Sequence, residues 1–156
     1  MEQLGRGLAG ILIVEGDSER PFDADLVLAL RDVRVGEDGR FLPFLTEEGA
    51  SRSGSFGTLR TVNGTPKPTL TVPAGGDVRL RLMNLDNTRV MEVGLERAEA
   101  AVVAVDGNAV PPLPLRSWRL GPAMRIDLAV RAPASGEVLL LDYFAPEPVE
   151  LARLAA

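Results

Sequence analysis

Hydrophobic and polar residues alternate along several short segments of the chain. In residues 78–83, Val78, Leu80 and Leu82 point to one face, and Arg79 and Arg81 point to the other. A period of two is typical of an antiparallel strand with one buried face and one solvated face. An apolar run without alternation instead predicts a strand in the middle of its sheet. The segments predicted as strands are residues 25–31, 78–83, 125–131 and 138–143.

Turn sequences separate these segments at short intervals. Asn63-Gly64 and Asp106-Gly107 supply the positive φ angles that tight hairpins require, and residues 73–77 and 133–136 carry similar signals. Many short strands joined by such turns predict an all-β sandwich or barrel. We expect residues 111–114, with three prolines, to form an extended connection, and residues 37–58 to form a mobile surface loop.

Helical patterns are weak. Residues 97–101 are compatible with one helical turn or with a loop. Residues 149–154 have apolar residues at i and i+3 spacing, and we expect the start of a short helix or a linker there.

The composition changes the picture mainly through two absent residue types. The 156 residues include no Cys and no His. Disulfides, zinc thiolates, iron–sulfur clusters and a Ser-His-Asp triad are therefore excluded, and so is a blue-copper site built by this chain alone. The formal net charge of −5 disfavours nucleic acid as a partner.

Each candidate for chemistry has a simpler structural interpretation. Asp106, considered as an acidic pair with Asp77, Asp86 or Asp127, lies in a turn sequence, and Asp127 lies on the solvated face of its strand. Residues 86–88 lack the spacing of a calcium loop and are better explained as a cap on a strand end near Asn84. The glycines of residues 5–10 precede a strand, which does not fit a dinucleotide loop. The single Trp118 is expected to be partly buried.

Several motifs, in order along the chain, resemble the multicopper oxidase family. Residues 7–14 (GLAGILIV) resemble the strand after the family's second His-x-His copper motif. Residues 61–64 (TVNG), Pro68 and residues 72–75 (VPAG) resemble the opening of its second cupredoxin domain. Residues 79–84 (RLRLMN) with Arg89 resemble that domain's RLRLLN…R signature, and residues 105–127 resemble its DG…P…L.P..R.D ending. The order holds from about Leu4 to Tyr143.

The resemblance implies a Greek-key β-sandwich of the cupredoxin type. In three-domain members of the family, the outer domains hold the coppers at a Cys-His-His centre and a trinuclear His cluster. The middle domain usually binds no metal and separates the other two. Since this sequence offers no His or Cys, none of the copper ligands carries over, and we predict no catalytic, cofactor-binding or metal-binding residue in this chain. Copper, and copper-dependent oxidoreductase activity, are implied for a longer parent protein only.

We therefore expect three parts in an excised middle domain. Residues 1–16 would be a remnant strand of a preceding cupredoxin domain, residues 17–146 a cupredoxin-like domain, and residues 147–156 a C-terminal linker or short helix. Residues 11–15 are expected to pair as a strand with an edge of this domain or of another copy. Faces that met flanking cupredoxin domains, around Leu113, Leu115 and Trp118, would expose apolar area and promote self-association.

Two functional hypotheses follow, and a third is weak. The first is a copper-free spacer domain of a periplasmic or secreted multicopper oxidase, inactive in isolation. The second is a copper-free binding or structural module of the bacterial cell envelope with the same fold. The third, an enzyme acting through two carboxylates such as a glycosidase, needs a convergent acidic pair that the sequence does not show. Met1-Glu2-Gln3 lacks the basic start of a signal peptide, and the apolar run after it is too short to span a membrane.

Overall fold

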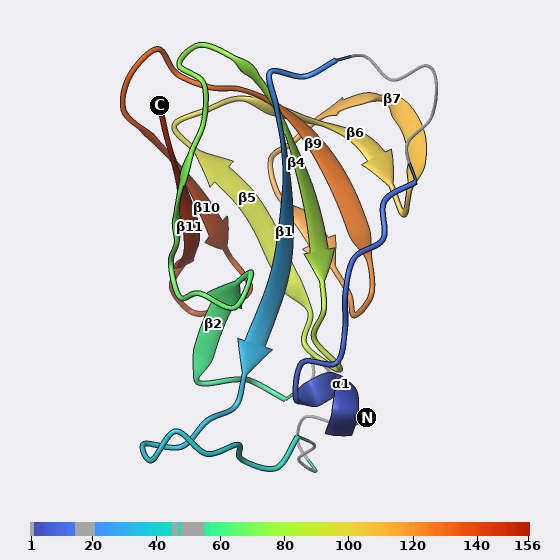
Figure 1. Cartoon of the computed structure of the whole chain (residues 1–156), viewed down its shortest axis with the longest axis vertical. Coiled ribbons are helices and arrows are strands. Elements are labelled where there is room, and N and C mark those ends of the chain that lie inside the picture. The colour runs from blue at the N-terminus through green and yellow to red at the C-terminus, as the bar shows by residue number, and fades with distance from the viewer. Residues whose placement is uncertain (1, 15–20, 45–46, 48–54) are drawn as a thin grey trace.

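The chain folds into two β-sheets packed face to face (Figure 1). The computed structural model describes residues 2–14, 21–44, 47 and 55–156. The six-stranded sheet has the order β2 (Leu59–Val62), β1 (Ala24–Val33), β4 (Asp77–Asn84), β9 (Arg125–Arg131), β6 (Ala100–Val105) and β7 (Asn108–Pro114). The five-stranded sheet has the order β3 (Thr69–Thr71), β11 (Val149–Ala155), β10 (Glu137–Asp142), β5 (Met91–Glu96) and β8 (Trp118–Leu120). A short helix, α1 (Glu2–Gly5), precedes them.

The predicted Greek-key sandwich of the cupredoxin type is confirmed. All four segments with strong strand patterns form strands, namely β1, β4, β9 and β10. In β4 the alternation of partly buried and buried positions is complete along all eight residues. The strand is not purely antiparallel, however, because it pairs in parallel with β1 and antiparallel with β9. Strand β10 lies between β11 and β5, as its apolar run predicted.

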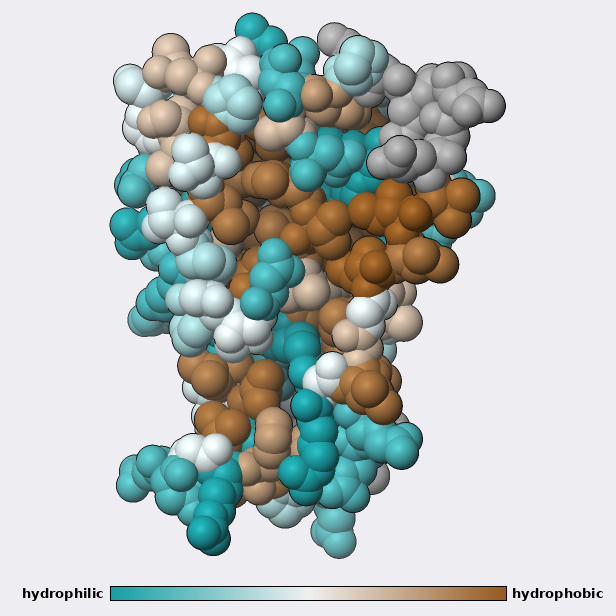
Figure 2. Space-filling view, in the orientation of Figure 1, coloured by the Kyte–Doolittle hydropathy of each residue, from teal (hydrophilic) through white to brown (hydrophobic). Residues whose placement is uncertain are grey.

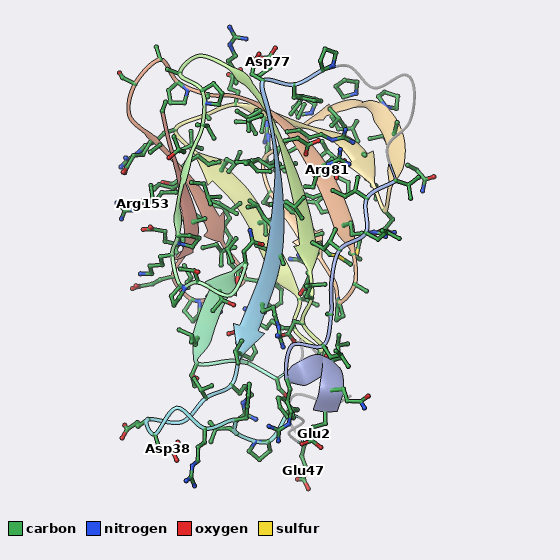
Figure 3. All side chains as sticks on the ribbon, in the orientation of Figure 1. Glu2, Asp38, Glu47, Asp77, Arg81 and Arg153 are labelled. Atoms are coloured by element: carbon green, nitrogen blue, oxygen red, sulfur yellow. The ribbon has the colours of Figure 1, made fainter. Side chains whose placement is uncertain are left out.

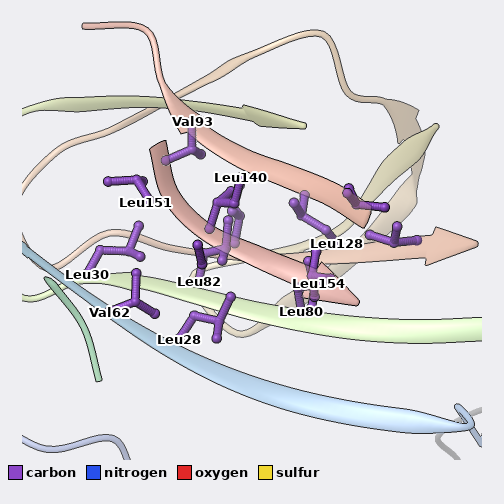
Figure 4. Packing of buried hydrophobic residues seen from close by; sticks show 14 of the residues in the cluster. Leu28, Leu30, Val62, Leu80, Leu82, Val93, Leu128, Leu140, Leu151 and Leu154 are labelled. Atoms are coloured by element: carbon purple, nitrogen blue, oxygen red, sulfur yellow. The ribbon is translucent and has the colours of Figure 1, made fainter. Parts of the chain in front are cut away.

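The core forms where the inward faces of the two sheets meet (Figure 4). Leucines of β1, β4 and β9 pack from the six-stranded sheet, and β5, β10 and β11 supply the opposite side. Burial of these side chains is the main stabilising contribution to the fold, at about 1.5–3 kcal/mol for each fully buried aliphatic side chain. The labelled core residues are Leu28, Leu30, Val62, Leu80, Leu82, Val93, Leu128, Leu140, Leu151 and Leu154.

The predicted hairpin turns are present. Asp106 and Gly107 have φ angles of 48° and 85° and join β6 to β7. Asn63 and Gly64, with φ angles of 52° and 81°, form the turn after β2. Two successive residues with positive φ give the twist that closely spaced antiparallel strands need.

The C-terminal residues form a strand, which corrects the expected linker or short helix at residues 147–156. Strand β11 pairs with both β10 and β3 and lies inside the five-stranded sheet. A β-bulge explains the misleading pattern, because Leu140 pairs with Ala152 whereas Leu141 pairs with Glu150. Leu151 is the extra residue, and both Leu151 and Ala152 are buried. The bulge interrupts the period of two and produces apolar spacing that resembles a helix.

Residues 8–14 form no strand, so the expected pairing of residues 11–14 with an edge of the same domain is wrong, while pairing with another copy stays a prediction. Leu12 is 89% exposed and Val14 is 84% exposed. The nearby sheet edge, β7, carries Pro111, Pro112 and Pro114, which have no backbone N–H to offer a new strand. Residue 15 lies outside the described residues. The assignment of residues 1–16 to a preceding domain stays a prediction.

Helix α1 is anchored on the outer face of the six-stranded sheet. The guanidinium of Arg31 in β1 donates to the carbonyl oxygens of Leu4 and Gly5, at 3.1 and 2.5 Å. A Cβ atom on Gly5 would lie 2.5 Å from the ring of Phe44, so only glycine allows this close approach.

The structure also corrects two smaller expectations. The prolines of residues 111–114 belong to edge strand β7 rather than to a connection, which an edge position permits. Residues 97–99 join β5 to β6 as a loop, so the helical alternative is wrong. Much of the expected loop at residues 37–58 lies outside the described residues.

Candidate functional site

Arg89 is the largest completely buried side chain among the described residues, and it links the two sheets. It lies in the connection from β4 to β5. Its Nε lies 3.2 Å from Oδ2 of Asp32 in β1, and its Nη2 lies 3.4 Å from Oδ2 of Asp142 in β10. Nη2 also donates to the carbonyl of Phe144 at 2.6 Å, and Nη1 donates to the carbonyl of Val90. Arg89 thus fastens both sheets to one connection.

The charges in this cluster balance each other. Arg60 of β2 places a second guanidinium 3.8 Å from Asp32 and 3.3 Å from Asp142. Because each carboxylate faces cations and hydrogen-bond donors, its partners offset the cost of removing it from water. The backbone N–H groups that also donate to these carboxylates belong to Gly57, Glu92 and Phe144. We call Arg89, Arg60, Asp32 and Asp142 the buried ionic cluster.

Aromatic rings cover the cluster. The Phe56 ring centroid lies 4.2 Å from Cζ of Arg89, and the Phe144 centroid lies 5.1 Å from it. A guanidinium placed over aromatic rings gains cation–π attraction. Both carboxylates of the cluster face arginines through Oδ2, while Oδ1 of Asp32 is buried without a hydrogen-bond partner in the structure. We interpret it as a structural clamp.

The residues considered for a calcium loop cap the end of β4, as predicted. The Asn84 side chain is buried, donates to the carbonyls of Arg89 and Leu120, and accepts from the N–H of Asp86. Asp86 in turn accepts from the N–H groups of Thr88 and Arg89. These bonds fix the loop that delivers Arg89 to the buried ionic cluster.

A groove of ≈ 1230 Å³ opens on the outer face of the six-stranded sheet, over β9, β6 and β7. Ala101 and Ala129 alternate with the core residues Val102 and Leu128, so they face away from the core. Small side chains leave the groove open. They are Ala98, Ala100, Ala101, Ala104, Ala109 and Ala129, with Pro112 and Pro114 on β7. We call this feature the β6–β7 groove.

Beside the groove, the outer face of β1, β4 and β9 carries a ladder of ion pairs. Arg81 lies 2.6 Å from Asp25 and 3.7 Å from Asp127, and Arg79 lies 2.6 Å from Asp127. Figure 3 labels Arg81 on this face of β4. The face expected to be solvated is therefore charge-paired and partly buried.

Two further ion pairs have pKa consequences. The hydrogen bond from Arg131 to Asp77, at 2.8 Å, raises the pKa of the Arg131 guanidinium above its usual range. Glu92 accepts hydrogen bonds from Ser117 at 2.7 Å and from Arg119 at 3.0 Å. These two bonds, led by Ser117, lower the pKa of the Glu92 carboxyl.

The acidic residues considered as a catalytic pair are engaged in separate roles. Asp106 sits in the β6–β7 turn and accepts from the N–H of Arg125 on β9, rather than from its own turn. Asp77 pairs with Arg131, Asp127 pairs with Arg79 and Arg81, and Asp86 caps the loop after β4. Trp118 is partly buried and packs against the core, as predicted.

Sequence reasoning noted Arg89 only as part of a signature. Its carboxylate partners lie 57 and 53 residues away along the chain. The sequence also contained an indication of the cluster at Asp32. This residue continues the inward-facing series after Leu28 and Leu30, and a buried charged residue requires a partner.

The two packed sheets form a cupredoxin-type β-sandwich, and comparisons with known proteins show the family to which the chain belongs. A sequence profile of the family described as multicopper oxidase matches residues 44–140. The chain resembles a multi-copper oxidase from Pseudomonas thermotolerans, with 46% identity, a TM-score of 0.91 and coverage of 99% of this chain and 37% of that chain. A multi-copper oxidase from Pseudomonas parafulva gives 44% identity, a TM-score of 0.89 and coverage of 98% and 37%. The chain belongs to the multicopper oxidase family.

The chain also resembles proteins named for another role. The cell division protein FtsP of Rahnella sp. (strain Y9602) is 32% identical over 141 residues, which are 85% of this chain and 29% of that protein. FtsP of Salmonella typhimurium is 29% identical over 146 residues, 88% of this chain and 30% of that protein. The chain therefore spans about a third of the length of its relatives.

The residues of this chain do not fit a copper centre. The whole sequence contains no His and no Cys, the ligands of blue-copper sites. The buried carboxylates Asp32 and Asp142 are held by arginines. Across residues 2–14, 21–44, 47 and 55–156, no group of three or more acidic side chains is placed to hold a metal ion. In the same ranges, no helix is long and apolar enough to cross a membrane.

Proposed function

We propose that this chain is the copper-free spacer domain of a multicopper oxidase whose parent couples substrate oxidation to oxygen reduction. The proposal rests on two observations taken together, the similarity to an oxidase and the absence of copper ligands. The chain is 46% identical to a multi-copper oxidase along nearly its full length, yet it contains neither His nor Cys. The copper ligands then belong to flanking cupredoxin domains of the parent, in the periplasm or outside the cell.

A spacer must keep two neighbours at a fixed separation, and the structure supports that role. Arg89 bonds to Asp32 in one sheet and to Asp142 in the other, which resists sliding of the sheets. The continuous core between the sheets adds stiffness because close-packed interiors deform little. The chain contains no His or Cys to hold a copper ion, so the proposal assigns the isolated domain no turnover of its own.

The reading frame around the codon for Met1 tests the proposal. In-frame His-x-His codons on either side, with a Cys codon in the downstream part, are expected for an oxidase parent. Expression of that whole frame should then give copper-dependent oxygen consumption that the 156-residue chain lacks. A frame that encodes no His-x-His motif overturns the proposal.

The similarity to FtsP favours one alternative. We propose as the second candidate a copper-free module of the bacterial cell envelope that acts in division, as the name of those relatives states for them. A long frame without copper motifs, together with a division defect on its deletion, would favour this role. Normal division combined with lost oxidase activity would exclude it.

A further inference from the structure

We propose that residues 8–14 of one copy pack into the β6–β7 groove of a second copy, so that the 156-residue chain forms a two-fold dimer by exchanging these segments. The proposal concerns this chain alone, and it stands or falls independently of the parent's activity.

The segment is apolar and uncharged, and all of its residues except Ile11 are exposed. Its sequence is Leu-Ala-Gly-Ile-Leu-Ile-Val. Leu8, Leu12 and Val14 are 75%, 89% and 84% exposed. Figure 2 shows hydrophobic surface gathered on the side of the molecule where this segment and β6 and β7 lie in Figure 1. Large exposed apolar patches on small domains mark interaction surfaces.

The groove complements the segment in shape. Alanines and prolines make up about half of the residues that line it, and such small side chains leave room for branched aliphatic side chains. The residues lining the groove do not include residues 8–14 of the same copy. The segment thus offers large side chains, and the groove offers room that the chain's own segment does not occupy.

The groove also complements the segment in charge. Arg131 at its rim is paired with Asp77 at 2.8 Å, and Arg79 is paired with Asp127 at 2.6 Å. Glu99 also lines the groove and is exposed in the single chain. Because the rim cations already have partners in the same chain, an uncharged occupant leaves no cation unpaired, whereas an acidic occupant must compete with Asp77 and Asp127.

Side-chain packing, rather than strand addition, is the mode that the sheet edge permits. The prolines of β7 cannot donate backbone hydrogen bonds to an added strand. Each copy carries one segment and one groove, so a two-fold arrangement satisfies both at once and closes without forming a fibre.

Sedimentation velocity across a concentration series tests the association. The unmodified chain is expected to pass from monomer to dimer as concentration rises. Leu12→Asp, at an exposed position where folding does not depend on the side chain, is expected to leave only monomer. Leu59→Asp makes the same chemical change at an exposed position on β2, at the opposite edge of the sheet, and should leave the dimer intact. Monomer at every concentration, or equal loss in both variants, overturns the proposal.

Engineered cysteines test the contact itself, since the chain has none of its own. Leu12→Cys and Ala101→Cys are made in separate chains, mixed and oxidised. A covalent dimer with one copy of each variant is expected, and a mixture of Leu59→Cys with Ala101→Cys should give none. The double variant Leu12→Cys/Ala101→Cys, oxidised at high dilution, identifies closure within one copy. Cross-linking only within one chain, or no mixed dimer, contradicts the exchange.

Discussion

The buried ionic cluster and the ladder of ion pairs on the outer face both consist of Arg–Asp pairs, but the two differ in their exposure to water. The side chains of Arg89, Asp32 and Asp142 are fully buried. On the outer face, the pair of Arg79 and Asp127 is partly exposed, and that of Arg131 and Asp77 is mostly exposed at its arginine. The difference teaches that a count of ion pairs says little about stability. What matters is the cost of leaving one partner behind in a dry environment.

The largest expected effect follows replacement of Arg89. Arg89→Met leaves two buried carboxylates with only Arg60 to neutralise them, and we expect the free energy of unfolding to fall by about 3–5 kcal/mol. Urea unfolding monitored by Trp118 fluorescence measures this change. If the variant does not fold, Asp142→Asn, which keeps the shape and removes one charge, should still unfold at a clearly lower urea concentration. A loss below about 1 kcal/mol for Arg89→Met, the value of an exposed pair, would remove the distinction between the two regions.

An intermediate effect is expected in the ladder. Arg79→Met removes a partly buried pair with Asp127, while Arg81 remains 3.7 Å from the same carboxylate. A loss of about 1–2 kcal/mol follows from the charge-assisted hydrogen bonds. A double-mutant cycle with Asp127→Asn isolates the pair. A coupling energy as large as that between Arg89 and Asp142 would show that exposure does not govern these pairs.

Arg131 provides the matched exposed case. Arg131→Met should leave the free energy of unfolding nearly unchanged, because water screens its pair with Asp77. High salt should diminish even this difference, while the effect of Arg89→Met persists. Stability that depends equally on salt in both variants would be inconsistent with a dry cluster.

The smallest expected effect is the pH response of Glu92. Hydrogen bonds from Ser117 and Arg119 lower its pKa in the folded chain. Its stabilising contribution is therefore complete above the ordinary carboxyl pKa and is lost as the pH falls through the lowered value. Ser117→Ala should bring the pKa back towards its usual range and reduce the fall in Tm on acidification. NMR titration of the Glu92 carboxyl checks this directly, and an unchanged pKa in Ser117→Ala would rule out the hydroxyl as the main cause.

The strands of the fold could be predicted where one physical signal acted alone. Along β4 and β9, large aliphatic residues at every second position marked the buried face, and most residues between them are charged. At β11 the strand period is hidden, because the bulge at Leu151 brings two neighbouring residues into the core. The N-terminal segment has the composition of a strand, but a strand needs a sheet edge with free backbone N–H groups. The prolines of the nearby edge strand β7 have none to offer.

The candidate site was harder to predict because it depends on distance in space. The sequence signature drew attention to Arg89, and the capping role of Asn84 and Asp86 followed from their position after a strand. The inward position of Asp32 showed that it needs a partner, but nothing local indicated that this partner would be Arg89 or that Asp142 would join them. The β6–β7 groove likewise requires the outward alanines of β6 and β9 to become neighbours through sheet pairing.

Metal analysis of the purified chain tests the central claim most directly. The chain is incubated with excess copper in either oxidation state, freed of unbound ion by gel filtration, and analysed for metal by mass spectrometry. The account predicts much less than one copper per chain and no blue absorption, because no His or Cys is present to bind the ion. One tightly held copper per chain would contradict it.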